Sequence, residues 1–360
     1  MNLADMLDEF NVVIDTAEGL TELRSLILGL AVRGKLVPQD PNDGSVSDLL
    51  STIEADTQKL YEKDYIRKPK NLNPVSEKEQ IFSLPESWKW VRLNSLTTYI
   101  QRGKSPKYQE GSGVYVINQK CVRWHGIELE HAKEIKPESL ESHEEKRFIQ
   151  SGDILWNSTG TGTIGRLTIA SDKVAGITVD SHVTLVRPSR VLSKYIWCWL
   201  AGKEVYGEIE NDASGSTNQI ELTKTYALNL PTPLPPLAEQ HRIVQKIESL
   251  FAEVGELEEK LNRQTKLDEK LQLAVNAEVQ QAQDAETSQS TWHFITSNFD
   301  TLYHTPEAID NLKKNILNEA VRGRLVPQNS KDEPASKLLK KIEAEKQRLY
   351  DEGEIRKPKD

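Results

Sequence analysis

The sequence predicts an α+β fold in which a strand-rich middle domain is flanked by long helices that pair as antiparallel coiled coils. Three observations predict it. A segment near the N-terminus is repeated near the C-terminus and carries a helical pattern in both places. Six of the seven tryptophans fall within residues 85–234, among short β-branched and aromatic runs. A further stretch shows apolar residues at alternating spacings of four and three, which is typical of a coiled-coil seam.

The first element is a helical region over residues 1–84, and most of it returns as a second helical region over residues 305–360. Residues 16–70 and 305–359 align without a gap, and 28 of the 55 aligned pairs are identical. The shared sequence includes AVRGKLVPQ against AVRGRLVPQ, and both copies end in I-R-K-P-K. Identity at this level over a fixed offset indicates a duplicated structural unit.

Each copy is expected to fold as a helical hairpin. Thr305-Pro306-Glu307 supplies an N-cap threonine, a proline in the first turn and an acid near the positive end of the helix dipole. Glycines at 34 and 323 are expected to end the first helices. The V-P-Q turn then leads to a second helix. Its apolar stripe is Leu49, Leu50, Ile53 and Leu60 in the first copy and Leu338, Leu339, Ile342 and Leu349 in the second.

The middle domain, residues 85–235, differs from its flanks in charge and in pattern. The whole chain has a formal net charge of −9, yet residues 85–234 hold 18 Lys+Arg and 17 Asp+Glu, so the acidity lies in the flanks. Apolar and β-branched runs alternate with turns, and residues 194–210 are typical of a helix. The expected strands are 114–120, 152–159, 165–171, 176–188 and 226–236.

Residues 160–165, GTGTIG, match the G-x-G-x-x-G spacing of dinucleotide-binding loops. Such a loop needs a strand before it and a helix after it, so that the pyrophosphate meets the helix N-terminus. Here the loop is followed by RLTIAS, which is a second β run. The pattern therefore indicates a strand–turn–strand corner and not a nucleotide site. The loop is either a tight hairpin without a ligand, or it offers hydroxyls, backbone amides and Arg166 to a phosphate or a base edge.

A long coiled-coil helix is expected over residues 236–283, followed by a polar linker over 284–304. Flanking charges leave only a narrow apolar stripe on the helix, which favours a coiled coil over an ordinary packed helix. The seam that we assign to pairing with another helix or a partner subunit is Ile243, Ile247, Leu250, Val254, Leu257 and Leu261. Beyond it the register slips to Leu267, Leu271 and Val275, as in a stutter.

The sequence shows no catalytic or metal-binding motif. It has no G-x-x-x-x-G-K-[ST] loop for ATP and no methyltransferase signature of the N-P-P-[YF] type, and its histidines lack metal-ligand spacing. Asp180-Ser181-His182 is expected on a strand, where neighbours point to opposite faces, and so is structural and not part of a triad. Cys121 and Cys198 are expected to be buried apolar residues. Without a long apolar run or a signal-peptide pattern, we expect a cytoplasmic protein.

Together these stretches resemble the specificity subunit of type I restriction–modification systems. The resemblance rests on the long helix, the twin AVRG[KR]LVPQ hairpins and four segments: LPESWKWVRL, SGDILWNSTGTGTIGR, ITVDSHVTLVRP and STNQIELTKTYALNLPTPLPPLAEQHRIV. It covers nearly the whole chain in the domain order of that family. It implies that residues 85–235 are a target recognition domain, which reads one half of a split DNA sequence.

The same resemblance implies partners and a division of labour. The helices would act as a fixed spacer and dock methyltransferase subunits, which carry S-adenosylmethionine and methylate adenine, and a translocating restriction subunit can join them. This chain itself is expected to bind double-stranded DNA but no membrane, metal or cofactor, and to catalyse nothing.

The chain departs from the family in one respect, because the family usually has two recognition domains and this chain has one. We therefore expect a homodimer of half-subunits that reads an interrupted palindrome, since protein symmetry is mirrored in the DNA site. One alternative is pairing with a different fragment. The other is a coiled-coil adaptor that does not recognise DNA.

The candidate DNA contacts are polar residues in loops between the expected strands. Asn and Gln can pair with adenine, and Arg or Lys with guanine or phosphate. The candidates are Gln101, Arg102, Lys104, Lys107 and Tyr108 in a basic loop, Asn118, Gln119, Lys120 and Arg123 after a strand, Asn157, Ser158, Thr159, Thr161, Thr163 and Arg166 in the glycine loop, and Ser214, Ser216, Thr217, Asn218 and Gln219 in a polar turn. For each of them, an ordinary solvated loop residue is the alternative.

Overall fold

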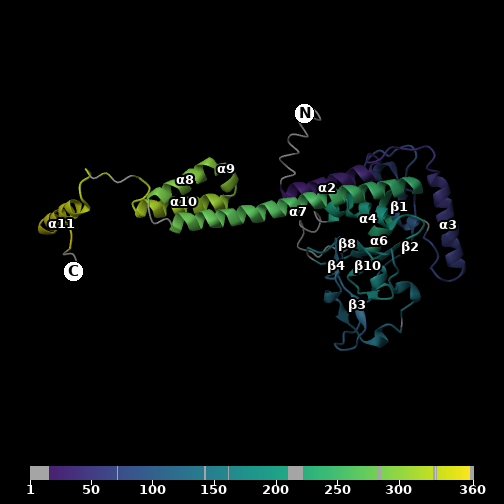
Figure 1. Ribbon diagram of the computed structural model, residues 1–360. Coiled ribbons are helices and arrows are strands. Elements are labelled where there is room, and N and C mark those ends of the chain that lie inside the picture. The colour runs from purple at the N-terminus through teal and green to yellow at the C-terminus, as the bar shows by residue number, and fades with distance from the viewer. Residues whose placement is uncertain are drawn as a thin grey trace. The chain divides into compact units, whose positions relative to one another are not determined.

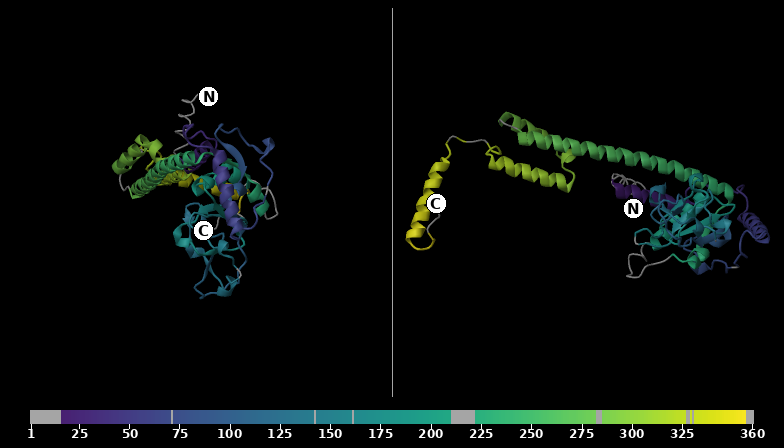
Figure 2. Two further views of the ribbon diagram at one scale, coloured as in Figure 1. Left: turned by 90° about the vertical axis from the view of Figure 1, so that its right-hand side faces the viewer. Right: turned by 90° about the horizontal axis from the view of Figure 1, so that it is seen from below.

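The computed structural model describes residues 16–70, 72–141, 143–160, 162–209, 222–281, 285–326, 329 and 331–356. The chain divides into two compact units, of which the first ends at Glu259 and the second begins at Lys260. Figures 1 and 2 show the helices and strands of which they are built. Among the described residues, no helix is both long enough and apolar enough to cross a membrane.

The first repeat copy forms the predicted hairpin of α2 (Ala17–Val32) and α3 (Val46–Glu62). The Thr16 hydroxyl accepts from the backbone amide of Gly19 at the start of α2. Gly34 follows the end of α2 with a φ of 66°, and a Cβ there would lie 2.5 Å from Cγ of Pro85. Only glycine therefore permits both this turn and the close approach of the middle domain.

Residues 85–234 form a compact domain of short strands, which we call the β-domain. Its first strand β1 (Lys89–Arg92) pairs with its last strand β11 (Pro231–Leu234). A four-stranded sheet has the order β2–β10–β7–β8, and a three-stranded sheet has the order β6–β3–β9. The remaining bounds are β2 Thr97–Arg102, β3 Tyr115–Ile117, β4 Val122–Arg123, β5 Gly126–Ile127, β6 Lys133–Glu134, β7 Ile154–Asn157, β8 Leu167–Ile169, β9 Thr178–Val179, β10 Val183–Pro188, α4 Ser193–Ala201 and α6 Lys224–Asn229.

The core of the β-domain is apolar on both sides of the four-stranded sheet. Strand β7 is buried along its whole length, and the indole Nε1 of Trp156 donates to the carbonyl of Gly165 at 3.1 Å. Helix α4 covers β8 and packs in turn against α2. Both cysteines are buried, as predicted, and burial raises the pKa of the Cys198 thiol to about 12. The predicted strand-rich α+β domain is therefore confirmed.

Two segments of the β-domain differ from the sequence-based expectation. Residues 226–236, expected as one strand, contain the end of α6 before β11 begins, because the Thr223 hydroxyl caps α6 by accepting from the amide of Tyr226. Asp180-Ser181-His182, expected on a strand, forms the turn between β9 and β10. The predicted helix over 194–210 begins as α4 and continues as a π-helical turn.

Helix α7 (Leu237–Gln281) is the predicted long helix, and its first part runs antiparallel to α2 within the first unit. Two contacts fix this direction, since Arg24 binds Glu258 at 2.7 Å while Gln39, beyond the other end of α2, donates to Glu239 at 2.5 Å. Only part of the predicted apolar seam on α7 is accessible to another chain. Ile243, Ile247 and Val254 are buried within this chain, Leu250 and Leu261 are half-buried, and Leu257 is exposed. The chain's own packing therefore covers Ile243, Ile247 and Val254, and pairing of the other seam residues with a partner subunit stays a prediction.

The second unit is built around the last part of α7. Residues 284–304, expected to be a linker, hold α8 (Ala285–Ser297) and α9 (Phe299–Leu302). Those helices form because their apolar side chains have a core to enter: Val275, Val279, Ile295, Leu302, Tyr303, Ala308 and Leu312 are buried together. The polar composition of this segment concealed that stripe.

The second repeat copy forms α10 (Pro306–Val321) and α11 (Ala335–Asp351). The predicted cap is confirmed, because the Thr305 hydroxyl accepts from the amide of Ala308. Burial nevertheless differs sharply between equivalent positions of the two copies. Val32, Leu28 and Ile53 are 0%, 6% and 2% exposed, whereas Val321, Leu317 and Ile342 are 89%, 65% and 41% exposed. Copy 2 therefore presents to solvent the apolar residues that copy 1 packs.

Candidate nucleic-acid interface

Sheet topology gathers four polar loops at one end of the β-domain. Strand β10 pairs antiparallel with both β2 and β7, so Thr184 near its start lies opposite Arg102 at the end of β2, and Val183 opposite Asn157 at the end of β7. Strands β3 and β9 are parallel and end together, and the amide of Asp180 donates to the carbonyl of Ile117. We call this end the loop face. It comprises residues 102–105, 118–120, 158–166 and 180–182, apart from the undescribed residue 161.

The glycine loop is a strand–turn–strand corner, as predicted, because β8 and not a helix follows it. The carbonyl of Gly160 accepts from the amides of Thr163 and Ile164, which closes a tight turn. Gly160 has a φ of 103°, and a Cβ on it would lie 2.5 Å from the Gln119 side-chain oxygen. The glycines therefore bring the loop against a neighbouring loop, and the dinucleotide interpretation stays rejected.

The loops hold one another through backbone contacts. The Arg102 guanidinium donates to the carbonyl of Ser181 from Nε at 2.8 Å and from Nη2 at 2.6 Å. A Cβ on Gly103 would lie 2.0 Å from the carbonyl oxygen of Val179, so only glycine allows these two loops to touch. The amide of Ser158 donates to the carbonyl of His182. The loop face is thus rigidly tied, as a recognition surface needs to be.

Several predicted contact residues support this face from below. Asn118 is buried and donates to the carbonyl of His131 at 2.7 Å, and Asn157 is buried and donates to the carbonyl of Gln119 at 3.0 Å. Ser158 is buried against the hydroxyl of Thr184. Their side chains fix the positions of the loops, and they do not present polar atoms to solvent.

Other predicted residues lie where a ligand can reach them. Gln119, Thr159 and Thr163 are half-buried, and the Thr159 hydroxyl lies 3.5 Å from the side-chain oxygen of Gln119. Lys120 is exposed beside them, and Arg166 is half-buried with a hydrogen bond to the carbonyl of Gly162. Lys104 directly follows Gly103, and Gln101 lies one residue before Arg102.

Three predicted residues lie apart from the loop face. The carbonyl of Lys107 accepts from the amide of Lys136, and Tyr108 lies under the Lys133 ammonium, so both belong to the edge near β6. Arg123 is engaged by Glu128 at 2.7 Å. Thr161 and the polar turn Ser214, Ser216, Thr217, Asn218 and Gln219 lie outside the described residues.

Sequence reasoning missed Ser181 and His182, which the structure places on the loop face. His182 is exposed, and its Nδ1 lies 2.6 Å from the Thr159 hydroxyl. Ser105 is exposed and its hydroxyl donates to that of Ser181 at 2.9 Å. The sequence signal for these two residues is Asp180, whose side chain accepts a hydrogen bond from the amide of His182 and so forms an Asx turn. This segment was expected to be a strand, so the turn was missed. Burial raises the pKa of the Asp180 carboxyl.

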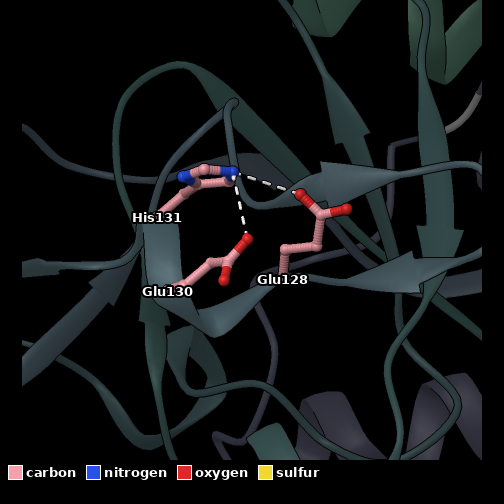
Figure 3. A group of neighbouring side chains, drawn as sticks. All are labelled: Glu128, Glu130 and His131. Atoms are coloured by element: carbon pink, nitrogen blue, oxygen red, sulfur yellow. Dashed lines mark ion pairs between the residues drawn. The ribbon is translucent and has the colours of Figure 1, made fainter.

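One cluster outside this face has the residue types of a metal site. Single ligand atoms of Glu128, Glu130 and His131 lie within 4.8 Å of one another. Figure 3 shows the two ion pairs that His131 makes with Glu128 and Glu130. Glu128 is already paired with Arg123, whose hydrogen bond is the main reason that the pKa of this carboxyl is lowered. Because the Arg123 guanidinium already neutralises one of the three groups, of which Glu130 is exposed and the other two are half-buried, these residues form a surface ion-pair network.

Comparison with known proteins places this arrangement in a family. Residues 85–267 match the family described as the type I restriction modification DNA specificity domain. The chain is 34% identical to the specificity subunits of the type I restriction enzymes EcoEI and EcoAI of Escherichia coli, over 95% of its own length. It spans 57% and 58% of those two relatives.

Solved structures are similar at lower identity. The HsdS subunit from Thermoanaerobacter tengcongensis is 18% identical with a TM-score of 0.37, and the match covers 72% of this chain and 52% of that one. A chain from a study of type I R-M complex assembly is 21% identical with a TM-score of 0.40, covering 61% of this chain and 50% of that one. The matched domain is named for DNA specificity and not for catalysis, and the chain belongs to the specificity-subunit family of type I restriction–modification systems.

Proposed function

We propose that this chain is the DNA-reading subunit of a type I restriction–modification complex and that its loop face reads one half of a bipartite target. The observation that carries the proposal is the loop face itself. Amide, hydroxyl and imidazole groups of Gln119, Thr159 and His182 are accessible there, on loops fixed by buried Asn118 and Asn157. Polar groups of these types read base edges when they are held in place before binding.

The helices fit the role of an assembly frame. Methyltransferase subunits, which carry S-adenosylmethionine, dock on them, and a restriction subunit joins the complex. The reading chain needs no cofactor of its own for this task. Part of α7 supports an assembly surface, because Leu257, Leu267, Leu271 and Leu273 are exposed on it.

A second chain completes the target in this proposal. The exposed apolar residues of copy 2, among them Leu317, Val321 and Ile342, supply a surface for pairing with another half-subunit. Two identical halves related by two-fold symmetry read an interrupted palindrome. Pairing with a different fragment instead gives two unrelated half-sites, and a pure coiled-coil adaptor gives none.

The test is a methylome. The chain is expressed with its methyltransferase subunit in a host free of adenine methylation, and modified adenines are read by long-read sequencing. We expect an interrupted palindrome. The absence of any motif from a stable complex would refute the homodimer and would mean that one recognition domain is not enough and a second, different half is required.

A matched pair of variants then tests the loop face. Gln119→Ala with Thr159→Ala should relax or change both halves of the palindrome in the same way, because each lost base contact costs about 1–3 kcal/mol of discrimination. Lys173→Ala, an exposed residue in the turn before β9, should leave the motif unchanged. An unaltered motif in the double variant would remove these two side chains from the reading surface.

A further inference from the structure

We propose that the basic end of the first repeat copy and the adjacent edge of the β-domain form a binding cleft for DNA phosphates. This inference rests on the proposed function and adds a site that holds the backbone while the loop face reads bases. The residues that line this cleft differ from the candidate DNA contacts named from the sequence, except for Gln101, which belongs to both sets. It involves the I-R-K-P-K sequence that ends the repeat.

The cleft has a volume of about 390 Å³ and a strong excess of positive charge. Six basic residues line it: Arg67, Lys68, Lys70, Lys146, Arg147 and Lys224. Among the described residues of the lining, Glu144 is the one acid, and it is shared between Lys146 at 2.5 Å and Arg67 at 3.8 Å. One carboxylate cannot neutralise six cations, so the cleft attracts a polyanion although the chain as a whole is acidic.

The cations come from two parts of the chain that hydrogen bonds hold together. The Asn94 side chain donates to the carbonyl of Lys70 at 3.4 Å, and the Arg92 guanidinium donates to the carbonyl of Asn73 at 3.0 Å. Farther back, Arg190 binds Asp56 of α3 at 2.7 Å. Residues 66–70, which we call the basic tail, are therefore anchored against the β-domain.

Like charges crowd one another inside the cleft. The pKa of the Lys224 ammonium is lowered, first by its partial burial and then by the positive charges of Lys70, Arg67 and Arg147. A bound phosphate would offset this repulsion, because an anion favours the charged form of each neighbour. Cations that gather without carboxylate partners are common in sites for phosphate.

The cleft and the loop face are joined by strand β2. Its first residues line the cleft, and the Lys224 ammonium donates to the side-chain oxygen of Gln101 at 3.2 Å. The next residue, Arg102, is tied to Ser181 on the loop face. Six residues of strand span about 17 Å, which corresponds to about five base pairs along a duplex. One half-site can therefore contact both surfaces.

The repeat offers a matched control for the experiment. The full chain is titrated against a fluorescein-labelled duplex that carries the methylome motif, and affinity is measured at increasing sodium chloride. One triple variant, Arg67→Gln/Lys68→Gln/Lys70→Gln, removes the three cations that copy 1 contributes to the cleft. The other, Arg356→Gln/Lys357→Gln/Lys359→Gln, removes the same charges from the same motif in copy 2.

The copy 1 variant should bind at least about tenfold more weakly, and the slope of log affinity against log salt should fall by about 2–3, since each phosphate contact contributes about 0.9. The copy 2 variant should match the wild type. Lys224→Gln, a single substitution on the β-domain side, should lower the slope by about one. Unfolding midpoints of all variants should agree, because the substituted lysines and arginine of copy 1 are exposed.

Four outcomes overturn the cleft. An unchanged slope in the copy 1 variant, with wild-type binding intact, refutes the cleft alone and leaves the proposed function standing. A changed methylation motif would assign these residues to base reading. Loss of the methyltransferase subunit with an unchanged salt slope would assign the basic tail to a protein partner. A wild-type chain that binds no duplex refutes the proposed function and the cleft with it.

Discussion

The two repeat copies share half of their residues but have opposite surroundings. In copy 1, the Arg33 guanidinium binds Glu204 of the β-domain at 2.6 Å and lies over the ring of Phe82. In copy 2, the equivalent Arg322 donates to the carbonyl of Gln280 and lies near Glu319 of its own helix. The same residue thus serves domain docking in one place and local capping in the other.

The difference teaches that local sequence determines the hairpin and the following domain determines its burial. Both copies begin with a capping threonine, and both pass through a glycine of positive φ after the first helix. In copy 1, Gln39 donates to the Glu239 carboxylate of α7, which also accepts from the indole of Trp88 in the β-domain. Helical stability in such hairpins comes mainly from packing of the apolar face, so the two copies should respond differently to the same substitution.

The largest expected difference is at the second helices. Ile53→Ala should lower the free energy of unfolding of the first unit by about 2–4 kcal/mol, because it leaves a cavity under a buried side chain. Ile342→Ala, its counterpart, should change stability by less than about 0.5 kcal/mol when the chain is dilute enough to be monomeric, because Ile342 is exposed within the chain. Urea unfolding of both variants measures this. Equal losses would mean that copy 2 is packed in solution as copy 1 is.

A second test concerns what covers copy 2. Val321→Asp places a charge on the most exposed of the apolar positions and should weaken self-association about tenfold to hundredfold, because it removes apolar burial and desolvates a carboxylate. Sedimentation equilibrium measures the dissociation constant. Lys337→Asp, an exposed change on α11, is the control. Undiminished self-association in Val321→Asp would place the pairing surface elsewhere.

The N-cap threonines of the two copies should contribute equally to stability. Thr16→Ala and Thr305→Ala each remove a hydroxyl that accepts from a backbone amide in the first turn. Each should cost about 1 kcal/mol, because the effect is local to the helix end. Circular dichroism during urea unfolding reports both. The corresponding serine variants should retain most of the stability, and a cost confined to one copy would contradict the local origin of the hairpins.

The smallest expected effect is a pH dependence of stability that comes from Glu239. The pKa of the Glu239 carboxyl is raised, chiefly by burial. The folded unit then holds this proton more tightly than the unfolded chain, so its stability falls as the pH rises from the ordinary carboxyl pKa through the raised one. Glu239→Gln should flatten that fall in the unfolding midpoint, whereas exposed Glu253→Gln should not. Parallel pH profiles for wild type and Glu239→Gln would exclude this carboxyl as the source.

The sequence predicted the features that depend on local chemistry. Thr305 and Gly34 set helix ends, and the alternation around β7 and β8 set the corner at the glycine loop. It did not predict features that depend on distant partners. The helices α8 and α9 need the end of α7 as a core, and the turn at His182 becomes part of the loop face only because β9 and β3 run in parallel.

The same limit applies to the site. From the sequence alone, Asn157 and Gln119 are equally good candidates for a base contact, since either side-chain amide can pair with a base. The structure separates them, because Asn157 is buried at the end of β7 and supports the loop that carries Gln119. Burial of a polar side chain is decided by the sheet around it, and that information is not present in the loop sequence alone.

The pairing of β1 with β11 has an evolutionary consequence. The chain enters the β-domain through β1 at Lys89 and leaves it through β11 at Leu234, and these two residues lie opposite each other in one ladder. The domain is therefore a closed insertion whose entrance and exit coincide, a geometry that tolerates replacement of everything between them. The residues between the two strands can therefore be exchanged as one block, while the β1–β11 pair and the helices on either side keep their sequence.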